Sequence, residues 1–440
     1  MQTELDGAVL RAVLADTGQA HTLLQETVAR DPQDGLARAL LAWHTGDQLC
    51  DARLREQMVR AQTDAAQAAS RVRSIVHGLN LFAHRHYTNA ASHLVVHLAQ
   101  FPADALVTPM IWAFTLTEDS DYIKHGYLLA ERQYALAGPE SWPWAAALAA
   151  ACAEQDRTVE ADRLARHALT LEPRSAPAAH ALAHAAHEQG SGTQYLNFVD
   201  GWLAADPQVP QRSHLQWHAA LQCLAAGDLD GARRRADTEL AHKDVGARSA
   251  VNWRLLLAGQ APARLVEADH ARALLAEPGG MVSIFHTFQL ALALTVVGDT
   301  PALEDLARAA ASDSRPAYAE VLAPVVRALA HVTDGRPGPA IDLLEKTGTQ
   351  LTRLGGVGVE REIIQDTLAR ALIDADQPDK AAHLLHHRRT TRRHHAYEDL
   401  LLATAQAAPL FPPRGQAASG PCVAQRCETQ GFFRELGACG

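Results

Sequence analysis

Turn-forming residues recur along this 440-residue chain at intervals of 34 to 41 residues, and this period constrains the fold more strongly than any other feature. Glycine favours the end of a helix because it adopts a positive φ without steric cost, and proline stops a helix. The markers are Pro173 and Pro207, 34 residues apart, Gly190 and Gly227, 37 apart, Gly298 and Gly335, 37 apart, and Asp376, 41 residues after Gly335. This spacing predicts an array of helical repeats.

The segments between these markers have the composition of paired helices. Runs such as WAAALAAACAEQ are strong helix formers, and aromatic residues make up only 5% of the chain. Small residues at Ala161, Ala168 and Ala232 would let two helices approach closely. We predict an all-α fold in which residues 1–407 form the array. Residues 408–440 are rich in proline, glycine and serine and lose the apolar period, so we expect a flexible C-terminal tail there.

The unit of helix, turn, helix and terminal proline resembles the tetratricopeptide repeat, which has a period of about 34 residues and small residues at the helix crossing. The resemblance implies a right-handed superhelical solenoid in which the first helix of each repeat lines a concave groove. The first unit, from Gly18 to Pro32, is short, and no repeat carries the full consensus. A plain bundle of α-hairpins is the alternative fold.

Three short sequence motifs show a closer resemblance, to the tetratricopeptide repeat protein 38 family. They are HALAHAAHEQG, SHLQWHAALQCLAAGD and LTRLGGVGVEREII, and the resemblance extends over residues 35–390. The family's glutamate falls on His187 and its late histidine falls on Gly358, whereas Arg361 is kept and Glu362 stands for an aspartate. The departures imply that any chemistry these groups perform in relatives is altered or lost here.

One helix of the array carries histidines at i, i+4 and i+7, within the stretch AHALAHAAHEQG. At about 100° per residue, these three side chains leave one helix face within about 60° of one another. By the repeat resemblance, that face and the corresponding face of the next repeat both line the groove. The candidate ligand-binding residues are His180, His184, His187, His214, Trp217 and His218.

Three kinds of chemistry are open to these residues. A groove with a few placed polar groups can bind a peptide or a small organic ligand, which is the function we predict. Alternatively, a groove histidine acts as a general acid or base in an enzyme on the same scaffold, with a small metabolite as the candidate substrate. Histidines at i and i+4 can also chelate a transition metal, but no carboxylate completes a known ligand set, so we predict neither metal nor cofactor.

Two features would separate these functions. A deep pocket around His184 with a carboxylate behind one histidine favours an enzyme, whereas an open groove along the whole array favours a peptide binder. A pure assembly scaffold would need no cluster of polar side chains on its concave face.

Charge and targeting features restrict the partners. The net charge of −10 opposes binding to nucleic acid or anionic membranes. The basic tract HLLHHRRTTRRHH lacks interleaved aromatic residues, and we predict a solvated helix end that could pair with acidic residues of another copy in a homodimer. The sequence shows no signal peptide, no run of ~18 apolar residues and no disulfide framework. We therefore expect a soluble cytoplasmic protein.

Overall fold

A computed structural model of the chain describes residues 5–45, 51–117, 120–240, 244–263, 267–276, 281, 283–407 and 409–411. Within these ranges every regular element is a helix and none is a strand, so the predicted all-α class is confirmed. Successive helices pack on one another in sequential pairs, as the repeat period predicts. None of the described helices is both long and apolar enough to cross a membrane.

The α-helices follow one another along the chain with short connections. The first group is α1 (Gly7–Ala15), α2 (Gly18–Arg30), α3 (Gly35–His44), α4 (Asp51–Asp64), α5 (Ser70–Ala83), α6 (Tyr87–Gln100) and α7 (Trp112–Thr115). The second is α8 (Ser120–Ala137), α9 (Trp142–Ala153), α10 (Thr158–Leu171), α11 (Ala176–Gln189), α12 (Thr193–Ala205), α13 (Arg212–Ala225) and α14 (Leu229–Arg234). The third is α15 (Val245–Leu257), α16 (Glu267–Ala276), α17 (Ile284–Val296), α18 (Thr300–Ala311), α19 (Ala323–Thr333), α20 (Pro337–Thr347), α21 (Gly358–Asp374), α22 (Pro378–Thr391) and α23 (Ala396–Ala403).

Short 3₁₀ or π segments extend or join several of these helices. They are η2 (Ala65–Gln67), η3 (Ala105–Ile111), η4 (Arg235–Glu239), η5 (Tyr318–Leu322), η6 (Gly348–Leu354) and η7 (Thr404–Gln406).

The turn residues that define the sequence period all have the backbone conformation that the period requires. The φ angle is +60° at Gly190, +80° at Gly227, +68° at both Gly298 and Gly335, and +59° at Asp376. Each of these residues follows the first helix of a pair, so it ends one helix and reverses the chain into the next. The positions of these five turns are therefore confirmed.

The prolines and alanines of the repeat pattern also lie where the pattern places them. Pro173 and Pro207 come directly after the residues that end α10 and α12. Ala161, Ala168 and Ala232 are completely buried on the second helices of their pairs. With only a methyl group at these points, α10 and α14 can pack closely on their neighbouring helices.

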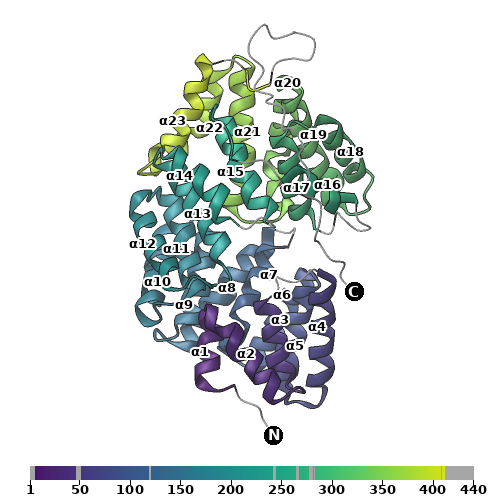
Figure 1. Ribbon diagram of the computed structural model, residues 1–440, viewed down its shortest axis with the longest axis vertical. Helices are drawn as coiled ribbons and strands as arrows, with labels where there is room; N and C mark the ends of the chain where they lie inside the picture. The colour runs from purple at the N-terminus through teal and green to yellow at the C-terminus, as the bar shows by residue number, and fades with distance from the viewer. Residues whose placement is uncertain are drawn as a thin grey trace, which may run out of the picture.

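The array folds back on itself, which a chain of nearest-neighbour repeats does not predict. In Figure 1 the N-terminal helices lie at the lower end, α8–α13 run along one side, and α21–α23 lie at the top beside α14 and α15. Helix α21 packs on α15, α22 contacts α11, and α23 contacts α13. The C-terminal helices therefore cover part of the face that the middle repeats would otherwise leave open.

The N-terminal hairpin also contacts the middle of the array. The side chain of Arg11 on α1 pairs with Glu172, which follows α10. The backbone N–H of Gly18 donates to Asp206 at 3.0 Å, and Gln211 donates to Asp16 at 2.9 Å. Segments from both ends of the chain thus lie close to α11–α13.

The first described residues of the predicted tail pack on the C-terminal core, so they are not flexible as expected. Phe411 stacks on the fully buried Trp253 with ring centroids 6.4 Å apart, and Leu410 also contacts this core. The rest of the predicted tail, residues 412–440, lies outside the described residues.

Replacing Phe411 with alanine should lower the free energy of unfolding by about 1–2 kcal/mol. The expected loss is smaller than the ~3–5 kcal/mol of a fully buried phenylalanine because Phe411 is only half-buried. Urea titrations followed by circular dichroism would measure it. Val159→Ala is the control, since Val159 is 82% exposed and should change stability by at most about 0.5 kcal/mol. Equal effects of the two substitutions would contradict the packing of Phe411.

Candidate functional site

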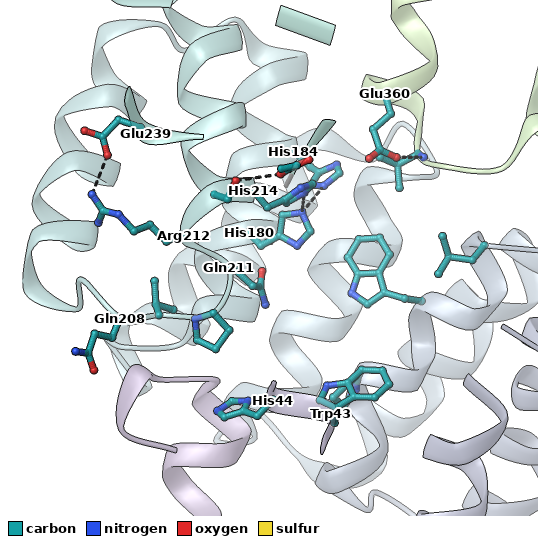
Figure 2. A pocket seen from close by; sticks show the side chains of 18 of the residues that line it. Trp43, His44, His180, His184, Gln208, Gln211, Arg212, His214, Glu239 and Glu360 are labelled. Carbon is teal, nitrogen blue, oxygen red and sulfur yellow. Dashed lines mark hydrogen bonds and ion pairs between the residues drawn. The ribbon is translucent and has the colours of Figure 1, made fainter. Parts of the chain in front are cut away.

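A cleft of about 850 Å³ opens where the two ends of the chain meet the middle of the array. Its walls come from α3, α5 and α7 on one side, from α11 and the start of α13 on another, and from the start of α21 on a third. Figure 2 shows His180, His184 and His214 between Trp43 and His44 below and Glu360 above. The cleft therefore has α3 at one end and α21 at the other.

Helix α11 presents two histidines to this cleft. Its first turn is capped by Ser175, whose hydroxyl accepts a hydrogen bond from the N–H of Ala178 at 3.2 Å. Its last turn is closed by Gly190 in the left-handed conformation. Because His180 and His184 are four residues apart, their side chains lie on one face, with Nε2 atoms 2.9 Å apart.

Helix α13 brings a second pair of histidines to the same point. His214 and His218 are also four residues apart, and His214 lies 34 residues after His180, one repeat period later. The Nε2 atoms of His214 and His180 are 2.9 Å apart. One ring nitrogen from each of four side chains lies within 4.8 Å of the others. We call this set the histidine cluster, and its members are His180, His184, His214 and His218.

Burial keeps the cluster in its neutral form. Desolvation, together with repulsion from neighbouring histidines, lowers the pKa of His184 to about 3 and the pKa of His218 well below its ordinary value. The pKa of His180 is lowered well below its usual range for the same two reasons. Burial also lowers the pKa of His214, although Asp244 opposes that shift. At neutral pH each ring therefore keeps one nitrogen lone pair.

The six predicted site residues divide into three groups. His180, His184 and His214 line the cleft, and His218 lies directly behind them, with its ring centroid 4.7 Å from that of His184. Trp217 stacks on the ring of His214 at 5.4 Å and borders a smaller cavity on the other side. His187 lies outside the cluster and contacts Glu362 at 3.2 Å.

Aromatic side chains from the N-terminal half complete the cleft, and sequence patterns did not identify them. Trp112 on α7 stacks on His180 with ring centroids 5.4 Å apart. Trp43 and Phe82 form an edge-to-face pair at 4.9 Å on α3 and α5. These residues come from three different helices, and no short-range spacing in the sequence connects them to the histidines.

A buried carboxylate stands behind one histidine of the cluster. Glu154 Oε1 is 3.7 Å from Nδ1 of His184, and its side chain is only 6% exposed. Burial raises the pKa of Glu154 to about 7, although the guanidinium of Arg361 and the N–H of Gly358 favour its ionised form. Arg361 belongs to the sequence motif LTRLGGVGVEREII, and it also donates to the carbonyl oxygen of Gly355 at 3.1 Å.

Two arginines of the basic tract at the end of α22, Arg388 and Arg392, belong to a buried ion-pair network. The prediction that the tract is a solvated helix end is therefore wrong for these two residues. Arg388 and Arg392 are 6% and 7% exposed. Both contact Glu362 at 2.6 Å, and Arg388 also reaches Asp366 at 2.7 Å. Burial alone would raise the pKa of Glu362, but the two guanidinium groups hold it well below its usual range.

This network fixes the end of α11. Arg392 pairs with Glu188 at 3.2 Å. The backbone N–H of Arg393 donates to the carbonyl oxygen of Gln189 at 3.0 Å. The backbone N–H of His394 donates to the carbonyl oxygen of Gly190 at 3.2 Å. A side chain at Gly190 would lie 2.8 Å from the Cβ atom of Arg392, so the close approach needs glycine. The C-terminal segment thus satisfies the last carbonyl groups of the histidine-bearing helix.

Comparisons with known proteins reveal remote likeness only. No protein-family model matches the chain, and no curated protein matches it. Among solved structures, the chain is similar to yeast Tom70 at 15% identity and a TM-score of 0.31, over 88% of this chain and 84% of that chain. It is also similar to the P58(IPK) TPR domain at 14% identity and a TM-score of 0.23, over 77% of this chain and 98% of that chain. At this similarity, neither structure indicates which ligand this chain binds.

The neutral histidine cluster should make the metal-free protein sensitive to mild acid. Below about pH 6.5, His184 binds a proton in the unfolded chain but not in the folded protein. Its contribution to the free energy of unfolding therefore falls as the pH falls. Between pH 7.5 and 5.5, His184 alone should remove about 1.4 kcal/mol from the free energy of unfolding. Urea titrations at both pH values would measure this, with EDTA present. Because the raised pKa of Glu154 shifts stability in the opposite direction over this range, the difference between variants is the test. His184→Gln should remove the contribution of about 1.4 kcal/mol, and the exposed control His383→Gln should not. The same pH dependence in His184→Gln and wild type would contradict the buried, neutral imidazole of His184.

Proposed function

We propose that this helical-repeat protein binds a small organic molecule in the cleft in front of the histidine cluster. One observation carries the proposal: a cleft of about 850 Å³ has aromatic side chains on one wall and converging imidazole groups on another. That volume lies within the ~300–1,000 Å³ of ordinary small-molecule sites, which combine apolar walls with a few placed polar groups. Trp43 and Trp112 supply faces for stacking, and His180 and His214 supply polar atoms.

A peptide is the less favoured occupant. An extended peptide would need a groove that continues along successive first helices of the array. The cleft has Trp43 of α3 at one end and Glu360 of α21 at the other (Figure 2). A compact ligand fills a space bounded in this way better than an extended chain does.

Catalysis is a second candidate function for the same cleft, favoured by Glu154. A general base needs an oriented imidazole, and a carboxylate beside the second ring nitrogen is a common means of orienting it. Glu154 lies on that side of His184 at 3.7 Å. Arg361 in turn neighbours Glu154 and opposes the rise of its pKa. Under this proposal, His184 is the positioned base and the bound molecule is the substrate.

The resemblance to the tetratricopeptide repeat protein 38 family stays a prediction. Two of the positions where this chain departs from the family lie against each other. His187, in place of the family's glutamate, is 3.2 Å from Glu362, in place of its aspartate. We propose that this contact now serves the docking of α21 on α11, outside the cleft.

The proposed ligand site can be tested with tryptophan variants. Compounds from a library of aromatic and heterocyclic metabolites that raise the melting temperature of the wild-type chain should bind Trp112→Leu more weakly. A buried tryptophan in a binding site is worth about 2 kcal/mol, which corresponds to about 30-fold in Kd. Thermal shift and isothermal titration calorimetry would measure the loss.

Trp142→Leu is the matched control because Trp142 is also half-buried but lies on α9, away from the cleft. It should keep the wild-type Kd. A stabilising compound that binds Trp112→Leu as tightly as wild type would contradict the assigned cleft. Catalysis would be favoured if the wild type turns over such a compound and if Glu154→Gln loses that turnover with little change in KM.

A further inference from the structure

The histidine cluster presents more nitrogen atoms to one point than hydrogen bonding can use. His180 Nε2 lies 2.9 Å from both His184 Nε2 and His214 Nε2. An imidazole nitrogen carries either one proton or one lone pair in the ring plane, so it forms one well-aligned hydrogen bond. One of the two short contacts at His180 is therefore left without a good hydrogen bond.

His218 adds a further set of unused polar atoms. Its side chain is 1% exposed, yet neither ring nitrogen has a hydrogen-bond partner among the described residues. Its ring centroid is 4.7 Å from that of His184 and 4.8 Å from that of His214. Because buried polar atoms are almost always bonded, these nitrogens point to a bound group that the polypeptide does not supply.

We infer that the four histidines of the cluster together bind one divalent transition-metal ion, a role that replaces the general-base role of His184 because a neutral imidazole has a single lone pair. Their ligand nitrogens lie within 4.8 Å of one another. In a tetrahedral site with bonds of about 2.0–2.1 Å, the nitrogens would be about 3.3 Å apart, so small rotations of the rings suffice. Imidazole nitrogen suits Zn²⁺, Co²⁺, Ni²⁺ and Cu²⁺, whereas Mg²⁺ and Ca²⁺ prefer oxygen ligands.

Two carboxyl groups lie near rings of the cluster, where they can orient the histidines. Glu154 lies 3.7 Å from Nδ1 of His184, the ring nitrogen on the side away from His180. Asp244 is near enough to His214 to oppose the fall in its pKa, and it is held by the hydroxyl of Ser213 at 3.0 Å. Carboxylates behind ligating histidines orient the rings and raise their basicity at known metal sites.

A second group of candidate ligands lies at the end of α11 but does not form a metal site. It comprises His187, Glu188 and Glu362. Both carboxylate oxygens of Glu362 already accept hydrogen bonds from Arg388 and Arg392. Two guanidinium groups at this distance repel a cation, so the metal belongs to the cluster of four histidines.

The metal itself is the probe in the test, which makes the result independent of the organic ligand proposed for the cleft. Full-length chain treated with EDTA and dialysed should take up one equivalent of Co²⁺, with the intense visible absorption bands of a four-coordinate ion. Zn²⁺ should displace the Co²⁺ and remove the bands. His180→Gln and His214→Gln should each weaken binding at least about 100-fold, since loss of an outer-shell partner already costs 10–100-fold.

Two further variants keep the test decisive. His383→Ala with His387→Ala removes an exposed i, i+4 pair on α22 that could bind metal at the surface, and this double variant should bind as wild type does. Glu154→Gln should keep the bands but weaken binding about 10–100-fold. No uptake by wild type at micromolar Co²⁺ or Zn²⁺, unchanged binding by His214→Gln, or loss of binding in the surface double variant would overturn the inference.

Discussion

The buried ion pairs between Glu362 and the two arginines of α22 are the interaction on which the arrangement of the chain depends. Each guanidinium group lies 2.6 Å from the carboxylate of Glu362. Without this negative charge, the two buried arginines would be costly to the folded state. Asp366 and Glu398 complete the neutralisation by pairing with Arg388 and Arg392. Because Glu362 lies on α21 and the arginines lie on or just after α22, the network first fixes this helix pair. Through Glu188 and the carbonyl groups at the end of α11, it then fixes the pair against the middle of the array.

The site is a consequence of that closure. With α21 docked, its first turn places Glu360 at one end of the cleft, while α3 places Trp43 at the other. The four histidines lie between, on α11 and α13; His184 and His218 are buried, and His180 and His214 are half-buried at the cleft. Burial then lowers the pKa of the imidazole groups and raises that of Glu154. Trp112 of α7 stacks on His180, so packing between helices distant in sequence, in addition to the repeat, contributes to the burial of the cluster.

The features that sequence could predict are those set by local geometry. The turns at Gly190 and Asp376 follow from the need for positive φ, and the convergence of His180 with His214 follows from helical spacing combined with a period of 34 residues. The stacking of Trp112 on His180 could not be predicted because α7 meets α11 only through tertiary packing. The burial of Arg388 was missed for a similar reason. A run of basic residues has the same composition whether it is solvated or paired, and its partner Glu362 lies 26 residues away.

Hydrogen–deuterium exchange of Glu362→Gln tests most directly whether the buried network holds the closed arrangement. The substitution leaves two buried guanidinium groups without their shared charge, which should cost about 3–5 kcal/mol. If the network holds the closed arrangement, amide exchange should be faster in α21, in α22 and at the end of α11, with α5 and α6 unchanged. Glu304→Gln is the control, because the side chain of Glu304 is 53% exposed and its contact with Arg336 is 4.0 Å long. Unchanged exchange in α11, or an equal acceleration over every described helix, would show that the network does not hold the closed arrangement.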